Sequence, residues 1–200
     1  MTPTEDSQQR RPGRRRLLLT VAAAAIAFAA ASALVGSLVS DDEVSSDKVD
    51  NYIAGKTQRP YVAADAQFRA TFPRLPKRES QTVNVRDVQL PLVTYTAESG
   101  DTSFFVGAYD LGPEAPFDLN AALNGAAANI DGSVKSAATE TFAGTDALHG
   151  VITLKDDAAT VELLVFRTRE RAYLIEVVGD SEAQVAKAFT EFKSSFALLT

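Results

Sequence analysis

The layout of the fold is decided by the stretch Val161-Glu162-Leu163-Leu164-Val165-Phe166. In a β-strand, Leu163 and Val165 lie on one face, and Leu164 and Phe166 lie on the other. A strand that is apolar on both faces belongs to a sheet that is covered on both sides. The stretch therefore predicts a buried central strand with a layer of structure on each side of it.

Further strands are predicted before and after this stretch. Alternating or β-rich runs predict strands at residues 66–72, 82–88, 90–97, 103–109, 147–155, 160–167 and 172–178. The segments Glu98-Ser99-Gly100-Asp101 and Asp156-Asp157-Ala158 have the composition of hairpin turns. Because sequential hairpins join the strands, we expect a mostly antiparallel sheet of about six strands.

Two helices complete the predicted α+β fold. The first spans residues 118–130, with Asp118 as its N-cap and Gly132 just past its end. The second follows Ser181-Glu182-Ala183-Gln184, which has the pattern of a capping box. Its apolar residues Val185, Phe189 and Phe192 fall on one face, so this helix is expected to pack on the sheet.

Three short segments resemble the PsbP/Mog1-like domain family. They are Phe68-Arg69-Ala70-Thr71-Phe72-Pro73-Arg74-Leu75-Pro76, Phe142-Ala143-Gly144-Thr145-Asp146-Ala147, and the close from Tyr173 to Leu198. The resemblance covers residues 64–199. It implies an antiparallel sheet between helices, an α/β/α sandwich. It also implies a binding or assembly role, because members of the family mostly bind or assemble other proteins, and bacterial members often sit outside the cell on an anchor.

The N-terminal region has the pattern of a membrane anchor. The uncharged run Leu17–Val39 is long enough, at about 1.5 Å per residue, to cross a hydrocarbon core of about 30 Å. Five arginines precede it and acids follow it, so the positive-inside rule places the N-terminus in the cytoplasm. We expect a cytoplasmic basic tail (1–16), a transmembrane helix (17–39), an acidic linker (40–60) and an extracytoplasmic domain (61–200).

A cleaved signal peptide is the alternative reading of this region. Ala31-Ser32-Ala33 has the small-residue pattern of a cleavage site, and Arg14-Arg15-Arg16-Leu17-Leu18 resembles a twin-arginine export signal. The apolar run continues past Ala33 to Val39, which favours a retained anchor. The protein is then a single-pass cell-membrane protein; after cleavage near Ala33 it would be secreted.

Composition argues against several functions. The chain has no Cys and one His, His149, which we expect to be a packing or strand-edge residue. Residues 41–200 carry 15 basic and 24 acidic side chains, so nucleic-acid binding is not expected. We predict no catalytic residues, no cofactor and no metal site, since no known catalytic, phosphate-binding or calcium-loop pattern is present.

Two groups of basic residues form the candidate interaction surface. The first lies near the start of the domain, and the second follows the central strand: Arg74, Lys77, Arg78 and Arg86, and then Arg167, Arg169 and Arg171. The first group could meet anionic headgroups or an acidic partner. The second alternates as if on one face of a strand end and could clamp a carboxylate or phosphate. The alternative is that both groups are ordinary solvated loop residues.

The sequence leaves three functions open. The first is a non-enzymatic, membrane-anchored extracytoplasmic module that binds or assembles an envelope protein partner. The second is a carrier of a small or lipidic ligand in a cavity between sheet and helices. The third is a hydrolase that would depend on His149.

Overall fold

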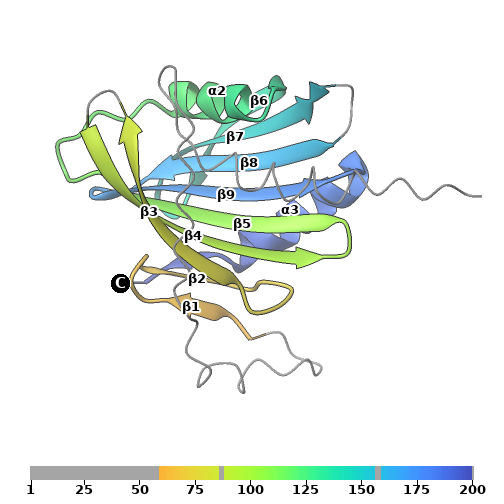
Figure 1. Cartoon of the computed structure of the whole chain (residues 1–200), viewed down its shortest axis with the longest axis horizontal. Coiled ribbons are helices and arrows are strands. Elements are labelled where there is room, and N and C mark those ends of the chain that lie inside the picture. The colour runs from red at the N-terminus through yellow and green to blue at the C-terminus, as the bar shows by residue number, and fades with distance from the viewer. Residues whose placement is uncertain (1–58, 86–87, 156–158, 200) are drawn as a thin grey trace, which may run out of the picture.

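The computed structural model describes residues 59–85, 88–155 and 159–199. In these ranges seven strands form one antiparallel sheet in the order β3-β4-β5-β9-β8-β7-β6 (Figure 1). Their bounds are β3 (Lys77–Val85), β4 (Val88–Ser99), β5 (Thr102–Asp110), β6 (Gly132–Phe142), β7 (Thr145–Leu154), β8 (Thr160–Arg167) and β9 (Arg171–Gly179). The predicted α+β class with a mostly antiparallel sheet is confirmed.

The central stretch lies in β8, and both of its faces are covered. Helix α2 (Leu119–Asn129) packs on the face that carries Leu163 and Val165, and helix α3 (Glu182–Ser195) packs on the face of Leu164 and Phe166. These β8 side chains are fully buried, and burying one such side chain stabilises the fold by about 1.5–3 kcal/mol. The apolar side chains on both faces of this stretch therefore correctly predicted a layer of structure on each side of the sheet.

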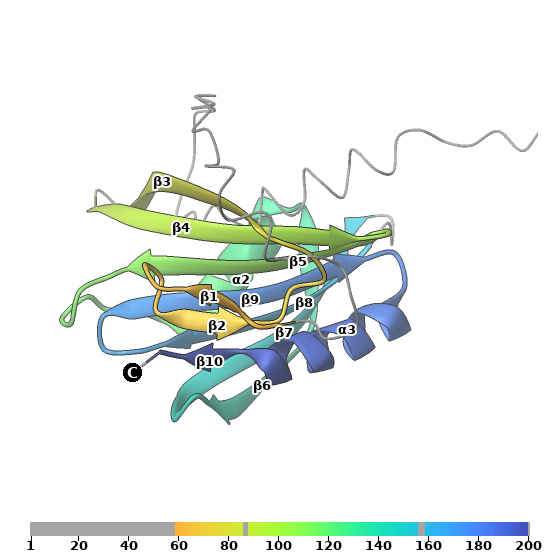
Figure 2. The ribbon, with the colours of Figure 1, turned by 90° about the horizontal axis from the view of Figure 1, so that it is seen from below.

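A second, small sheet shares the α3 face. It has the order β1-β2-β10, with β1 (Tyr61–Ala63), β2 (Phe68–Ala70) and β10 (Ala197–Leu198). Figure 2 shows it beside α3, on one side of the large sheet. Stacked rings of Phe68 and Phe196, 5.1 Å apart, join the start of the domain to its end.

The two helices begin differently. The carboxylate of Asp118 accepts hydrogen bonds from the backbone N–H groups of Asn120 (2.8 Å) and Ala121 (3.0 Å), so this predicted N-cap is confirmed. Ser181 occupies the N-cap position of α3 but makes no side-chain cap bond, so the predicted capping box is wrong. The carboxylate of the next residue, Glu182, accepts a hydrogen bond from Lys135 of β6 at 2.8 Å.

Several predicted strand limits are wrong. The strands expected at 82–88 and 90–97 are β3 and β4, which begin at Lys77 and Val88, and Pro91 lies inside β4 opposite Thr82. The strand expected at 66–72 is shorter than predicted, because β2 spans only Phe68–Ala70. The first half of β3 is exposed, so no burial enforces the alternation from which strands are recognised.

The largest omission is β6, for which the sequence predicted no strand. Lys135 to Thr139 are all exposed, and a register shift at Lys135 interrupts the pairing with β7. Because both faces of this stretch meet solvent, the period of two that marks a half-buried strand is absent.

The predicted tail, anchor and nearly all of the linker, residues 1–58, lie outside the described residues. The same holds for Arg86 and for the turn at 156–158, although β7 and β8 pair as the predicted hairpin requires. Among the helices that are described, none is long and apolar enough to cross a bilayer.

Candidate functional site

The first predicted basic group is neutralised within the fold. Arg74 pairs with Glu98 at 3.0 Å, Lys77 with Glu79 at 2.7 Å and Arg78 with Asp65 at 2.7 Å. Each described cation therefore has a carboxylate partner within the chain. These contacts lower the positive potential that the sequence alone suggested for this surface.

Asp65 is the centre of this neutralised region. It accepts from the Tyr95 hydroxyl at 2.5 Å and from Arg78, and its backbone carbonyl accepts from Arg171 at 2.7 Å. Partial burial acts to raise the pKa of Asp65, but hydrogen bonds from Tyr95 and Arg78 outweigh it and lower the pKa below its ordinary value. Burial, together with the bond to Asp65, raises the pKa of Tyr95. The network fastens the β1–β2 loop to the large sheet.

The second predicted basic group does not share a strand face. Arg167 ends β8 and Arg171 begins β9, with Arg169 in the turn between them. The predicted alternation is wrong because the chain reverses direction inside the run. Arg171 pairs with Asp110 at 2.6 Å, so it joins the neutralised cations.

Arg167 instead binds backbone carbonyls. Its guanidinium donates to the oxygens of Gly112 (3.1 Å) and Pro113 (3.2 Å) and to that of Ala115. A weaker bond runs to the carbonyl of Arg169 at 3.4 Å. The side chain thus fixes the loop between β5 and α2 against the β8–β9 turn.

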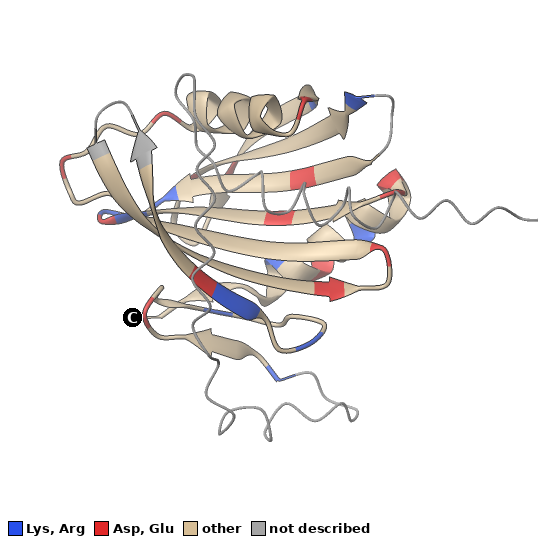
Figure 3. Cartoon of the chain, in the orientation of Figure 1, with Lys and Arg blue, Asp and Glu red and all other residues tan. Residues whose placement is uncertain are grey.

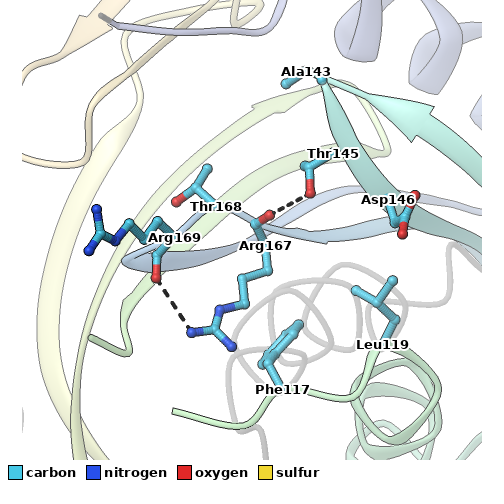
Figure 4. Close-up of a pocket in the computed structure, with 9 residues that line it drawn as sticks. Phe117, Leu119, Ala143, Thr145, Asp146, Arg167, Thr168 and Arg169 are labelled. Carbon is cyan, nitrogen blue, oxygen red and sulfur yellow. Dashed lines mark hydrogen bonds between the residues drawn. The ribbon is translucent and has the colours of Figure 1, made fainter. Parts of the chain in front are cut away.

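A hollow of about 580 Å³ opens where these loops meet, and we call it the loop-end hollow (Figure 4). Its lining comes from three separate parts of the chain: Phe117 and Leu119, then Ala143, Gly144, Thr145 and Asp146, and finally Arg167, Thr168 and Arg169. Phe117 and Leu119 are half-buried, whereas Asp146 and Arg169 are exposed. The hollow therefore offers an apolar patch next to charged groups.

Local backbone features hold the hollow in shape. Ala143 and Gly144 turn β6 into β7 with φ values of 50° and 79°, a conformation that glycine adopts without strain. The Thr145 hydroxyl donates to the carbonyl of Arg167 at 2.8 Å. The backbone N–H groups of Leu111 and Gly112 donate to the carbonyl of Glu170. The three loops are thereby joined to one another by hydrogen bonds.

The charge at this hollow differs from that of the neutralised region. Among the described residues, no carboxylate lies within ion-pair distance of Arg167 or Arg169. The carbonyls fix the Arg167 guanidinium but carry no charge that could cancel it. In Figure 4 the guanidinium of Arg169 points away from Phe117. With Asp146 as the one acid in the lining, an anionic group close to the two arginines would be favoured.

The lone histidine packs, as expected. His149 Nε2 lies 3.0 Å from an oxygen of Glu162, and its ring stacks on Phe189 with centroids 4.8 Å apart. It lies in the middle of β7 rather than at a strand start. In the ranges that the structure describes, no cluster of three or more His, Cys, Asp or Glu side chains could hold a metal ion.

One buried carboxyl was missed by the sequence reasoning. Glu176 in β9 is fully buried on the α2 face, opposite Phe105 and Leu163. Neither of its side-chain oxygens has a hydrogen-bond partner among the residues that the structure describes. Burial raises its pKa to about 8, so the neutral form predominates at pH 7. The only signal in the sequence is a single acid inside the apolar run of β9.

The apolar side of the hollow was also missed. Phe117 and Leu119 flank the N-cap of α2, and the sequence analysis named neither of them as a candidate site residue. The segment 142–147 resembles a loop of the PsbP/Mog1-like family, and this resemblance is the one signal in the sequence for this part of the lining. Comparisons of the sequence with models of known protein families and with curated proteins found no match.

Proposed function

We propose that this protein is a non-enzymatic, membrane-anchored extracytoplasmic module that binds an envelope protein partner at the loop-end hollow. The bound feature would be an acidic side chain or chain terminus next to an apolar side chain. Such a feature matches the chemistry of the lining, where the guanidinium of Arg167 lies near the ring of Phe117 (Figure 4) and the exposed Arg169 adds a second positive charge.

The observation that carries this proposal is the fixed, uncancelled charge of Arg167. A guanidinium held by carbonyls is already oriented, so little conformational entropy is lost when it meets an anion. Burial of the neighbouring apolar surface by the partner would stabilise the complex by about 25 cal/mol for each Å² that is removed from water. The cations of β3 differ from Arg167, because Lys77 and Arg78 are each paired with a carboxylate.

The wider assignment rests on the sequence. The PsbP/Mog1-like pattern favours a binding or assembly role, and the observed sheet with a helix on each face is compatible with that pattern. The run Leu17–Val39, if retained, would hold the hollow outside the membrane and close to other envelope proteins.

The test compares two charge reversals in the full-length protein, tagged at its C-terminus and crosslinked in native membranes before solubilisation. Arg169→Glu should lower recovery of the partner several-fold, because it places an anion at the hollow. Lys77→Glu is the matched control, since Lys77 is equally a surface cation but already has an acidic partner. We expect it to leave recovery unchanged.

Two results would count against the proposal. One is equal recovery of the partner with both variants. The other is recovery of the protein alone, with a small molecule detected by native mass spectrometry, which would favour a ligand carrier instead.

A further inference from the structure

Strand β6 forms one outer edge of the large sheet. The sheet order places it last, and no described strand pairs with its outer side. It is 11 residues long, and Ser136 to Thr139 are exposed. Beyond the register shift at Lys135, its pairing with β7 is regular, so the outer N–H and C=O groups of this stretch can accept another strand.

The surface around this edge carries few charges. Helix α2, which packs over β6, has the sequence LNAALNGAAAN without an acid or a base, and Figure 3 shows it uncoloured along its length. The two charged side chains of β6 lie on the α3 face. Lys135 bonds Glu182, and Glu140 bonds Lys193. The centres of stable interfaces are depleted of charge in the same way.

We infer that the outer edge of β6 binds β6 of a second copy of this chain. A two-fold axis at Ala138, perpendicular to the sheet, makes the strands antiparallel and keeps both α3 layers on one side. Ala138 then faces Ala138 of the second copy, Ala137 faces Thr139, and Ser136 faces Glu140. Every directly opposed pair in this stretch includes a small side chain, so the backbones can pair without steric conflict.

The charged side chains of β6 favour pairing with β6 of a second copy about an axis at Ala138. Because Ser136 would face Glu140 of the other copy, Lys135 of each copy would lie one residue, about 3.4 Å along the strand, from Glu140 of the other. Positive and negative side chains then alternate along a row that crosses the axis. Lys193 and Glu140 of one copy come first, and Lys135 and Glu182 of the other copy follow. An axis at Thr139 would instead bring the two Glu140 carboxylates to diagonal positions on the same face, which like charges disfavour.

A single-cysteine experiment tests the inference, because the natural chain contains no Cys. Ala138→Cys in the full-length protein should give a disulfide-linked dimer on mild oxidation in the membrane, since only a residue on the axis meets itself. Thr141→Cys is the register control, and Ser80→Cys, on the opposite edge strand β3, is the edge control. Both should give several-fold less dimer.

A second pair of variants measures association directly in the solubilised full-length protein. Ala138→Lys opposes two like charges on the axis and should weaken dimerisation about tenfold, whereas Ala138→Ser should leave it unchanged. Equal crosslinking at positions 80, 138 and 141 would overturn the inference. So would a different protein captured at position 138, or a monomer at every concentration.

Discussion

Arg78 lies in the edge strand β3 and Arg167 at the end of the interior strand β8 of the same sheet, and the two guanidinium groups have different hydrogen-bond partners. The guanidinium of Arg78 meets the carboxylate of Asp65, so the pair is electrically neutral. The guanidinium of Arg167 meets the carbonyls of Gly112, Pro113 and Ala115, which fix its position and leave its charge intact. The neutralised region therefore joins parts of the fold, while the loop-end hollow retains a positive charge without a carboxylate partner among the described residues.

Glu176 is a third ionisable side chain in a different environment from those of Arg78 and Arg167. Its carboxyl is buried and has no hydrogen-bond partner in the described part of the chain, so the fold favours its neutral form. These three regions differ in what surrounds one ionisable group, and each therefore responds differently to substitution and to pH.

The largest expected effect is a pH dependence that arises from Glu176. Its pKa is raised to about 8 in the folded protein, against about 4.3 in the unfolded chain. Its contribution to stability is therefore fully present below pH 4 and is lost as pH rises toward 8, at roughly 1.4 kcal/mol per pH unit. Urea unfolding of the wild type and Glu176→Gln between pH 5 and 8 measures this effect.

The variant removes the titrating group with little change of shape, so its stability relative to the wild type should increase steadily with pH. Parallel stability curves for the two proteins would show that Glu176 has an ordinary pKa in the fold. That result would remove this third region from the comparison.

The second effect concerns the carbonyl clamp. Arg167→Met keeps much of the apolar stem but removes all donors, so the loop before α2 loses its hydrogen bonds. We expect the free energy of unfolding to fall by about 2 kcal/mol. Arg169→Met is the control and should change it by less than about 0.5 kcal/mol. Equal effects of the two variants would mean that Arg167 does not hold the loop.

The third effect sharpens the contrast with Glu176, because it has the opposite sign. The pKa of Asp65 is lowered in the fold, so Asp65 stabilises above the unfolded pKa of about 3.9 and this stabilisation is lost as pH falls. Because the carboxylate is 45% exposed, solvent screens it, and Asp65→Asn should cost about 1 kcal/mol at pH 7. A cost that is no smaller at pH 3 than at pH 7 would show that the pKa of Asp65 is not lowered in the fold.

The smallest effect is expected at the exposed ion pair between Lys77 and Glu79. Lys77 and Glu79 are both highly exposed, and exposed pairs contribute little to stability. Lys77→Ala should change the free energy of unfolding by less than about 0.5 kcal/mol, measured in the same urea titrations at low and high salt. A loss above 1 kcal/mol would mean that the β3 edge is held by its charges.

The sequence predicted the parts of the fold in which burial imposes a pattern. The β8 stretch, the first helix with its Asp118 cap and the hairpin at Gly100 were all recognised because each has a local chemical signature. The middle of strand β6 has no such signature, because residues 135–139 are all exposed.

The loop-end hollow was predicted only in part. Arg167 and Arg169 were named, but Phe117, Thr145 and Asp146 are distant from them in the chain. The pairing of β7 with β8 brings Thr145 and Asp146 close, and the hydrogen bonds of Arg167 hold the loop that carries Phe117. Similarly, nothing in the sequence distinguished Arg167 from Arg171. Their difference depends on which segment lies opposite each guanidinium, a carboxylate in one case and a loop of carbonyls in the other.

The most direct test of the central claim places a photo-crosslinking residue at Asp146, which lines the hollow, or at Gln81, an exposed position on β3. Crosslinking is carried out in native membranes with the full-length protein, and the products are compared between the two positions. We expect a partner to be crosslinked at position 146 and not at position 81, and the product to be lost when Arg169→Glu is added. A partner captured equally at both positions, or at position 81 alone, would contradict it.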